Sequence, residues 1–480
     1  MVESIDKYSY TIEHINKNDS FCFLITLRFN GGRNEKTELK MPESFGPLTG
    51  YEKCISVISV NGSNVNWSLD GANLVFSHPQ FQQIEVIYEL RNFPNLVQSD
   101  GIQKIMSLFY PRIDERNFVM FGNSLFLYPN PDKPIEVTLD FISLVDFRDR
   151  IYSSFGKGNY FTFTCNRSGD LLDSLFFGSV TNIPEKLIDK SGNIIYYIMQ
   201  GSVHLDNEAL KQSALKIISG LREFWGEKTA PPFLIRLGFD PLTDTEGKPI
   251  SYHLGSALKN ALTIYASADI KLIEFQKLLF HEMMHCWIGV KLRATNKEIE
   301  DYQYLWFTEG FTEYFTYKAM YRSTLLSTAD YQQVINEEFL GWLNKSPYKN
   351  ISNKEICESF DSDEFLMQLP YKRGFVFALF LDLKIKSESD HKYGLIDFVK
   401  EITRYYEKSD LVIDDNFTFF SKTCSHYIGE EFDILFKSYI EQGKSIDFSS
   451  ANDLPYLHFS DDSDMVKITA SSEDVKLLMI

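Results

Sequence analysis

The chain has 480 residues, of which 44% are hydrophobic and 15% aromatic, and its net charge is −18 at pH 7. This length predicts two or three domains, and the acidic balance argues against nucleic acid or an anionic membrane surface as a partner. No apolar run reaches transmembrane length, and the polar first 20 residues carry no secretory signal, so we expect a cytoplasmic protein. The six cysteines show no paired spacing and are expected to be reduced thiols.

The first 200 residues are predicted to be a β region. Ser20–Phe29 alternates between apolar and polar residues and ends at a turn, and Cys54–Val60 and Ile84–Leu90 are further strands rich in β-formers. Short strands with turn signals at this spacing indicate a β-sandwich. We therefore predict an N-terminal β-sandwich domain over residues 1–204, in which no catalytic motif stands out.

The pattern becomes helical after His204. Asn207–Trp225 carries a broad apolar stripe, Pro232–Phe239 resembles a buried strand, and Leu254–Ala266 is a strand or a strand pair. We predict a catalytic domain over 205–445, followed by a tail or short strands over 446–480. Its C-terminal part is expected to be helical over Asp330–Leu343, Glu355–Leu369, Tyr371–Lys386, Leu395–Tyr405 and Glu430–Gln442.

The segment HEMMH carries the chemistry. Lys271–Leu292 is predicted to be a helix, and His281 and His285 lie one turn apart on one face of it. Two imidazoles in this arrangement suit two ligand positions of a zinc ion. Glu282 is too close in sequence to be a comfortable third ligand and is therefore the expected general base for a zinc-bound water. The alternative is a buried helix with two core histidines.

Zinc needs a third protein ligand and an open fourth position. Glu309 is the best candidate, because it lies in the apolar, helix-forming run Tyr304–Met320. Its rivals are Glu298 and Glu300, which lie in a polar stretch typical of a loop. Alternatively, Glu309 is an ordinary acid at a helix N-terminus. Glu313, one turn beyond Glu309, is a candidate acceptor for a metal-bound histidine.

The segments HEMMHCWIGVKLR and LWFTEGFTEYF resemble the glycyl aminopeptidase family of zinc peptidases and the larger aminopeptidase N and leukotriene hydrolase family. Both are gluzincins, with two His and one Glu on a single zinc. The resemblance implies a multidomain α+β protein in which the β-sandwich precedes a thermolysin-like α/β peptidase domain with a mostly helical C-terminal part. Tyr371, in a segment similar to the families' Y-x-K/R-G, falls where they keep a tyrosine that hydrogen-bonds the tetrahedral intermediate.

Three departures from these families matter. The gap between His285 and Glu309 is longer than in the aminopeptidase N type. The chain beyond Gln442 is too short for the PDZ domain that glycyl aminopeptidases usually carry. The families also keep an acid that binds the substrate's free amine on a strand before the metal helix. Here the matching stretch is Ser256–Asn260, with Lys259 in the acid's place.

An ammonium facing the substrate's ammonium is repulsive in a water-poor cleft. If Lys259 points into the cleft, we expect cleavage inside chains or a preference for acidic or blocked substrates. Alternatively Lys259 points to solvent from an edge strand. The candidate substrate-binding residues are Gly255, Ser256, Ala257, Lys259 and Asn260.

The sequence thus predicts a zinc-dependent peptidase that acts on peptides with zinc-activated water. Zinc would be held by His281, His285 and Glu309, Glu282 would move the proton, and Tyr371 would stabilise the oxyanion. Two alternatives stay open at this point. One is a hydrolase of another bond, such as an epoxide, and the other is a zinc-containing binding protein without catalysis.

Overall fold

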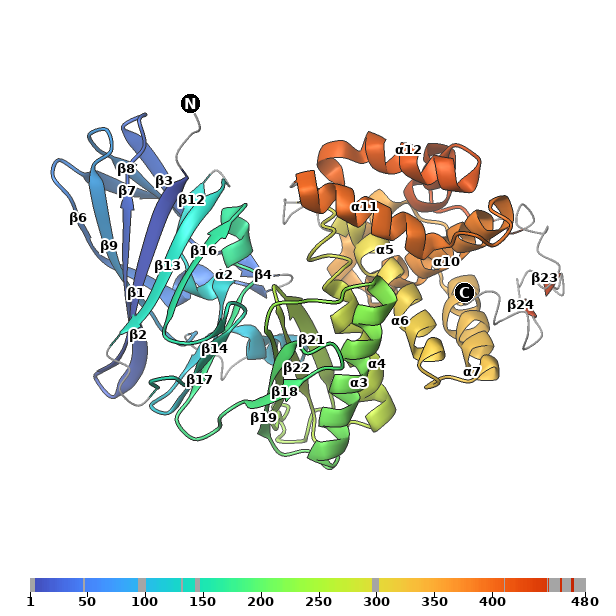
Figure 1. Ribbon diagram of the computed structural model, residues 1–480, viewed down its shortest axis with the longest axis horizontal. Helices are drawn as coiled ribbons and strands as arrows, with labels where there is room; N and C mark the ends of the chain where they lie inside the picture. Colours follow the sequence, from blue (N-terminus) through green and yellow to red (C-terminus); the bar gives the residue numbers. More distant parts are fainter. Residues whose placement is uncertain are drawn as a thin grey trace. The chain divides into compact units, whose positions relative to one another are not determined.

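The protein is described by a computed structural model, which covers residues 5–45, 48–93, 101–130, 133–142, 147–295, 302–409, 411–446, 448, 458–459 and 468–469. The chain forms two compact units (Figure 1). The first contains residues 1–215 and 228–272, and the second contains 216–227 and 273–480. Within the part of the chain that is covered, none of the helices combines the length and apolar character that crossing a membrane requires.

A six-stranded sheet forms one layer of the first unit. Its central pair, β1 (Asp6–Lys17) and β2 (Ser20–Asn30), is antiparallel, and β1 also pairs in parallel with β13 (Ile135–Ile142). The predicted strand over Ser20–Phe29 is confirmed. The order across the sheet is β16 (Tyr160–Cys165), β13, β1, β2, β9 (Gln83–Leu90) and β6 (Ile55–Asn61).

Smaller sheets complete this β region. One runs in the order β10 (Arg112–Ile113), β11 (Asn117–Phe121), β17 (Leu175–Ser179), β14 (Ile151–Ser153) and β15 (Gly156–Lys157). Another runs β12 (Tyr128–Asn130), β3 (Lys36–Lys40), β8 (Asn73–Ser77) and β7 (Asn66–Asp70), and β4 (Ser44–Phe45) pairs with β5 (Leu48–Thr49). The short helices α1 (Gly101–Met106) and α2 (Gly122–Leu125) lie between strands.

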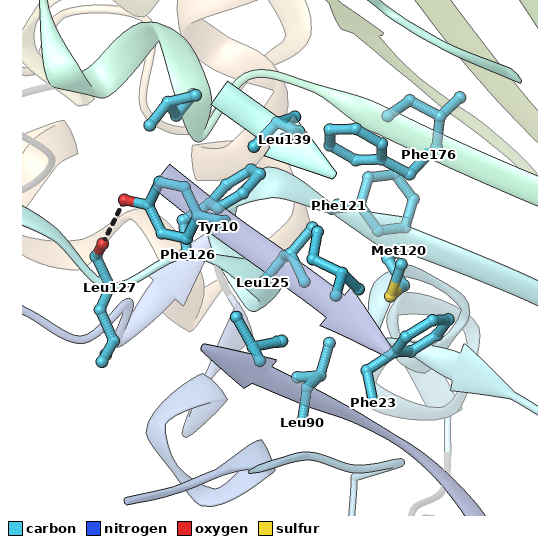
Figure 2. Close-up of a cluster of buried hydrophobic side chains, with 14 of the residues drawn as sticks. Tyr10, Phe23, Leu90, Met120, Phe121, Leu125, Phe126, Leu127, Leu139 and Phe176 are labelled. Carbon is cyan, nitrogen blue, oxygen red and sulfur yellow. Dashed lines mark hydrogen bonds between the residues drawn. The ribbon is translucent and has the colours of Figure 1, made fainter. Parts of the chain in front are cut away.

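Side chains from the two larger sheets meet in one apolar core. Tyr10 and Phe23 come from the six-stranded sheet, Phe121 and Phe176 from the five-stranded one, and all four are buried (Figure 2). The Tyr10 hydroxyl donates a 2.7 Å hydrogen bond to the Leu127 carbonyl, so its polar end is satisfied within the core. Two sheets that bury their inner faces against each other form a sandwich, as the strand spacing predicted.

The remaining sheet of the first unit is mixed. Its order is β18 (Glu185–Ile188), β19 (Ile194–Gly201), β20 (Phe233–Phe239), β22 (Ala261–Ala266) and β21 (His253–Leu258). The three central strands are parallel, and α3 (Asn207–Trp225) connects β19 to β20. The sheet therefore runs across residue 204, and the domain boundary placed there stays a prediction. Leu254–Ala266 is a strand pair, with Lys259 and Asn260 in its turn.

The second unit is mainly helical (Figure 1). The metal motif lies on α4 (Leu272–His285) and on the short helix α5 (Leu305–Thr308), which leads into α6 (Gly310–Arg322). The other α-helices are α7 (Thr328–Gln333), α8 (Gly341–Lys345), α9 (Asn353–Ser359), α10 (Glu364–Glu388), α11 (Leu395–Ser409), α12 (Phe417–Ile428) and α13 (Phe432–Phe436). Two further segments are π-helical, Val334–Leu340 and Lys437–Glu441. Near the C-terminus, β23 (His458–Phe459) pairs with β24 (Ile468–Thr469).

Three helix predictions were wrong in their extent. The metal helix ends at His285 instead of Leu292, because the chain reverses at Gly289, whose φ of 118° is outside the helical region. Glu355–Leu369 and Tyr371–Lys386 were expected to be separate helices. Instead, α10 continues through Pro370, because burial of nearly its whole second half outweighs the hydrogen bond that proline cannot donate. The helix α12 was not predicted.

Aromatic side chains build the core of the second unit. Trp306 on α5 is 1% exposed, and its ring contacts residues from α6, α10 and α13. The contacting rings are Phe307, Phe311, Phe377 and Phe436. These contacts anchor the segment that leads into Glu309, so the core directly positions a predicted metal ligand.

Candidate metal centre

His281 and His285 lie on the last turn of α4, on the same face of the helix. Their Nε2 atoms are 3.0 Å apart, and the two rings are nearly perpendicular, at 83°. Both side chains are largely shielded from solvent, with exposed fractions of 12% and 15%. The spacing of four residues therefore places two imidazole nitrogens at one point.

Glu309 reaches the same point from the junction of α5 and α6. Its Oε2 atom lies 3.2 Å from His281 Nε2 and 3.4 Å from His285 Nε2. Among the described residues, these three side chains form a group whose ligand atoms all lie within 4.8 Å of one another. Glu298 and Glu300, the rival ligands, lie outside the residues that the structure describes.

The donor set fits zinc in both type and spacing. Two ligands of a tetrahedral zinc ion, each about 2.1 Å from the metal, are separated by about 3.4 Å. The three distances between Nε2 and Oε2 atoms are 3.0, 3.2 and 3.4 Å. Two imidazoles and one carboxylate also match the His₂Glu ligand set found in catalytic zinc sites, which leave one position open.

The opposite ring nitrogens have partners that orient both imidazoles. His281 Nδ1 lies 2.9 Å from Glu313 Oε1, and His285 Nδ1 lies 3.1 Å from the Ile288 carbonyl oxygen. An acceptor at Nδ1 favours the tautomer in which Nδ1 carries the proton and Nε2 is free to bind a metal. The sequence offered Glu313 as such an acceptor. The Ile288 carbonyl was missed, because only the chain reversal after α4 brings it back to the ring.

The electrostatics of the metal-free centre reflect these contacts. Burial by itself lowers the pKa of His281, but the carboxylates of Glu309 and Glu313 raise the pKa of this imidazole well above its usual value. Burial raises the pKa of Glu313, whereas His281 and Lys277 lower it, and the net pKa is about 2. Two carboxylates that remain ionised at neutral pH thus surround the imidazoles, so the centre attracts a cation.

Glu282 and Tyr371 are the two predicted catalytic side chains. Glu282 is 6% exposed and lies near enough to His285 and Tyr371 to raise the pKa of each. Burial, followed by the charge of Glu309, raises the pKa of the Tyr371 hydroxyl well above its usual value, and a hydrogen bond joins this hydroxyl to the Glu309 carboxylate. Tyr371 therefore stays protonated at neutral pH and can donate a hydrogen bond.

A crossing of two helices brings Tyr371 to Glu309. Gly310 on α6 meets Gly374 on α10 so closely that a Cβ atom on Gly310 would lie 2.3 Å from the Gly374 Cα. A Cβ atom on Gly374 would lie 2.0 Å from the Trp306 carbonyl oxygen. Both positions therefore require glycine. Each glycine lies within one helical turn of a site residue, and their close approach sets the distance between Glu309 and Tyr371.

The candidate substrate-binding residues belong to the first unit. Gly255, Ser256 and Ala257 lie on β21, an edge strand, and Lys259 and Asn260 form the turn that follows. Lys259 is neither free nor fully solvated, because its Nζ atom lies 3.2 Å from Asp170 Oδ2. The role of these five residues in substrate binding stays a prediction.

Comparisons with known proteins agree with the resemblance that the two motifs carry. Residues 274–371 match the M61 glycyl aminopeptidase family, which confirms the predicted family for this segment. None of the curated protein sequences is significantly similar to the chain.

Solved structures share the fold. An aminopeptidase N family protein from Idiomarina loihiensis has a TM-score of 0.68 and 17% identity, over 95% of this chain and 81% of its own. An M1 zinc metallopeptidase from Deinococcus radiodurans has a TM-score of 0.56 and 11% identity, over 92% of this chain and 95% of its own. A variant of the Deinococcus enzyme with a bound Tyr-Ser-Ala substrate is similar to the same extent, at 12% identity. These similarities confirm the predicted fold class.

Proposed function

We propose that this protein is a zinc-dependent peptidase. The observation that carries the proposal is the convergence of two Nε2 atoms and one carboxylate oxygen, from His281, His285 and Glu309, at mutual distances of 3.0–3.4 Å. Metal binding needs both Nε2 atoms unprotonated, and a cation between two such nitrogens and a carboxylate takes the place of the proton that the carboxylates favour on the metal-free imidazoles. The matched family and the solved neighbours are peptidases by name, which agrees with the same assignment.

His281, His285 and Glu309 would hold the zinc ion. When bound, zinc lowers the pKa of water towards neutrality and polarises a peptide carbonyl. Glu282 accepts the proton of the attacking water and then delivers it to the leaving amine. The protonated hydroxyl of Tyr371 donates a hydrogen bond to the oxyanion that develops on the carbonyl.

The burial of Glu282 suits a residue that accepts a proton from water and delivers it to the leaving amine. The side chain of Glu282 is 6% exposed, so it is largely removed from bulk water. The same burial keeps other water from competing for its proton. Glu282 and Tyr371 thus supply the base and the hydrogen-bond donor that peptide hydrolysis needs, beside the same carboxylate ligand.

The experiment compares Glu282→Gln with Glu274→Gln, a control on the first turn of the same helix. We expect Glu282→Gln to retain stoichiometric zinc and to lose about 10²- to 10⁴-fold in kcat/KM on a peptide library. Glu274→Gln should keep both properties. If purified protein binds zinc and hydrolyses no peptide, or if Glu282→Gln remains fully active, the proposed function is wrong.

Recognition of the substrate's amino end is a separate part of the proposal. No Asp or Glu occurs between Gly247 and Ser267, and Lys259 stands where the related families keep an amine-binding acid. We therefore expect no requirement for a free α-amine. The test is hydrolysis of matched peptides with free and N-acetylated ends, and faster cleavage of the free-amine series would contradict this expectation.

A further inference from the structure

A small cavity in the second unit is lined by three cationic side chains. Its volume is about 70 Å³, which exceeds the space that a single water molecule needs. Arg373, Lys349 and Lys444 are the charged residues of its wall, Asn344 and Ser445 are polar, and no described lining residue carries a carboxylate. In a chain whose net charge is −18, this is an unusual local excess of positive charge.

Arg373 forms the buried part of this wall. Its exposed fraction is 5%, and Nη2 donates hydrogen bonds to the carbonyl oxygens of Ile351, at 2.9 Å, and Lys349, at 3.3 Å. Nη1 is also buried, and it has no hydrogen-bond partner in the described part of the chain. Two backbone carbonyls therefore satisfy only one side of a planar group that presents five donors.

The charge of Arg373 is likewise uncompensated by any residue that the structure describes. No carboxylate lies within ion-pair distance of its guanidinium among the described residues, and burial lowers its pKa to about 10. Buried charges in proteins are normally paired, since an unpaired one costs several kcal/mol. In contrast, the buried Lys318 has the Asp382 carboxylate 2.9 Å away. Within the described residues, Arg373 is thus a buried cation that lines this cavity and has no anionic partner.

The exposed lysines explain how an anion would enter. Lys349 precedes α9, and Lys444 follows the last π-helical turn, so the cations come from separate segments that converge on one cavity. Both lysines are exposed, whereas Arg373 is buried. The wall thus combines two exposed cations with one buried guanidinium, and both kinds of group are common ligands of oxyanions in proteins.

We propose that this cavity binds a tetrahedral oxyanion, with inorganic phosphate as its representative. The cationic side chains come from three separate segments of the wall, which suits an anion with four oxygens better than a planar carboxylate. A charge between −1 and −2 also matches three surrounding cations better than chloride does. The bound anion ties α10 to the segments around Lys349 and Lys444. This binding site is independent of the zinc centre and of the proposed peptidase activity.

The test measures binding of inorganic phosphate to the zinc-loaded full chain by thermal shift and by calorimetry, with ionic strength held constant by chloride. Phosphate should raise the melting temperature saturably, because a ligand that binds only the folded state stabilises it. The double variant Lys349→Gln/Lys444→Gln should bind phosphate about tenfold more weakly. Lys345→Gln, a change of a nearby exposed lysine that does not line the cavity, should bind phosphate like the unchanged protein.

Arg373→Gln should abolish phosphate binding, and the double lysine variant keeps the proposal testable if Arg373→Gln does not fold. The proposal is overturned if phosphate gives no saturable shift at millimolar concentration, or if the double variant responds like the Lys345→Gln control. Equal stabilisation by acetate would also overturn it. Because binding is read from stability and heat, these outcomes do not depend on whether the protein is a peptidase.

Discussion

The helices α6 and α10 contribute to two groups of ionisable side chains that are shielded from solvent. The two groups differ in whether their hydrogen-bond acceptors already have donors. In the first group, both carboxylate oxygens of Asp382 accept hydrogen bonds. Oδ2 accepts from the Tyr314 hydroxyl at 2.6 Å and from Lys318 at 2.9 Å, Lys386 lies 3.4 Å away, and Oδ1 accepts from the Leu395 amide at 2.6 Å. This group is closed, because its acceptors already have donors.

In the second group, three side chains that can each bind a metal ion face one another. The Nε2 atoms of His281 and His285 and the carboxylate of Glu309 point to a common centre, and the Nδ1 atoms are occupied by Glu313 and the Ile288 carbonyl. Both groups are shielded from most solvent, with side-chain exposed fractions of 0–3% for Asp382 and its lysines and 12–16% for the three metal-centre residues. The direction in which donors and acceptors face distinguishes them.

The largest expected effect is that of Glu309→Gln. The substitution keeps the shape of the side chain and removes the charge that draws a cation to the imidazoles. Loss of a residue that only hydrogen-bonds a metal ligand lowers metal affinity or activity by up to roughly 100-fold. We expect zinc affinity and kcat/KM of Glu309→Gln to fall by more than this. Zinc content after dialysis and peptide hydrolysis are the measurements. Glu337→Gln, an exposed change, is the control. Stoichiometric zinc in Glu309→Gln would contradict its assignment as a ligand.

The matching change in the closed group is Asp382→Ala. It leaves Lys318 and Lys386 buried without a carboxylate, and breaking a buried pair in this way costs about 3–5 kcal/mol. The melting temperature should fall strongly, while the folded fraction still binds zinc. Asp330→Ala, which removes an exposed helix cap, should cost much less. Loss of zinc at unchanged stability would show that the two groups are not separable.

Glu313→Gln tests the orienting role of the carboxylate beside His281. The amide that this substitution introduces can still contact Nδ1 but is uncharged, so the imidazole becomes a weaker ligand. We expect zinc affinity to fall by about 10- to 100-fold, as is usual for outer partners of metal-bound histidines. Competition with a zinc-selective chelator measures this change. If Glu313→Gln binds zinc as tightly as the unchanged protein does, Glu313 does not orient His281 for metal binding.

The smallest effect concerns pH and belongs to the closed group. Burial, together with Lys318, lowers the pKa of Lys386 from 10.5 to about 8, although Asp382 opposes the shift. Between these two values the unfolded chain binds more protons at this lysine than the folded protein does. The free energy of unfolding therefore rises with pH in this window, by about 1 kcal/mol from pH 8 to 9. The rise should be absent from Lys386→Met, as judged by melting temperature, and an unchanged slope would argue against the shift.

Helical and strand periodicity is enough to predict the parts of the centre that depend on one element. A spacing of four residues on a helix is enough to align His281 with His285, and the alternation in Ser20–Phe29 is enough to indicate a strand. Both depend on the periodicity of one element. The same holds for Glu313, which lies one turn beyond Glu309 and was identified from that spacing alone.

The lengths of the helices and the surroundings of the centre depend on packing between segments that are distant in the chain. The chain reversal at Gly289 places the Ile288 carbonyl beside His285. Burial of α10 allows this helix to continue through Pro370. The close contact of Gly310 with Gly374 places Glu309 near Tyr371. That Arg373 has no carboxylate partner in the described part of the chain is likewise a result of which segments pack around it. Each of these features depends on which segments meet in space, and helical or strand periodicity carries no information about contacts between distant segments.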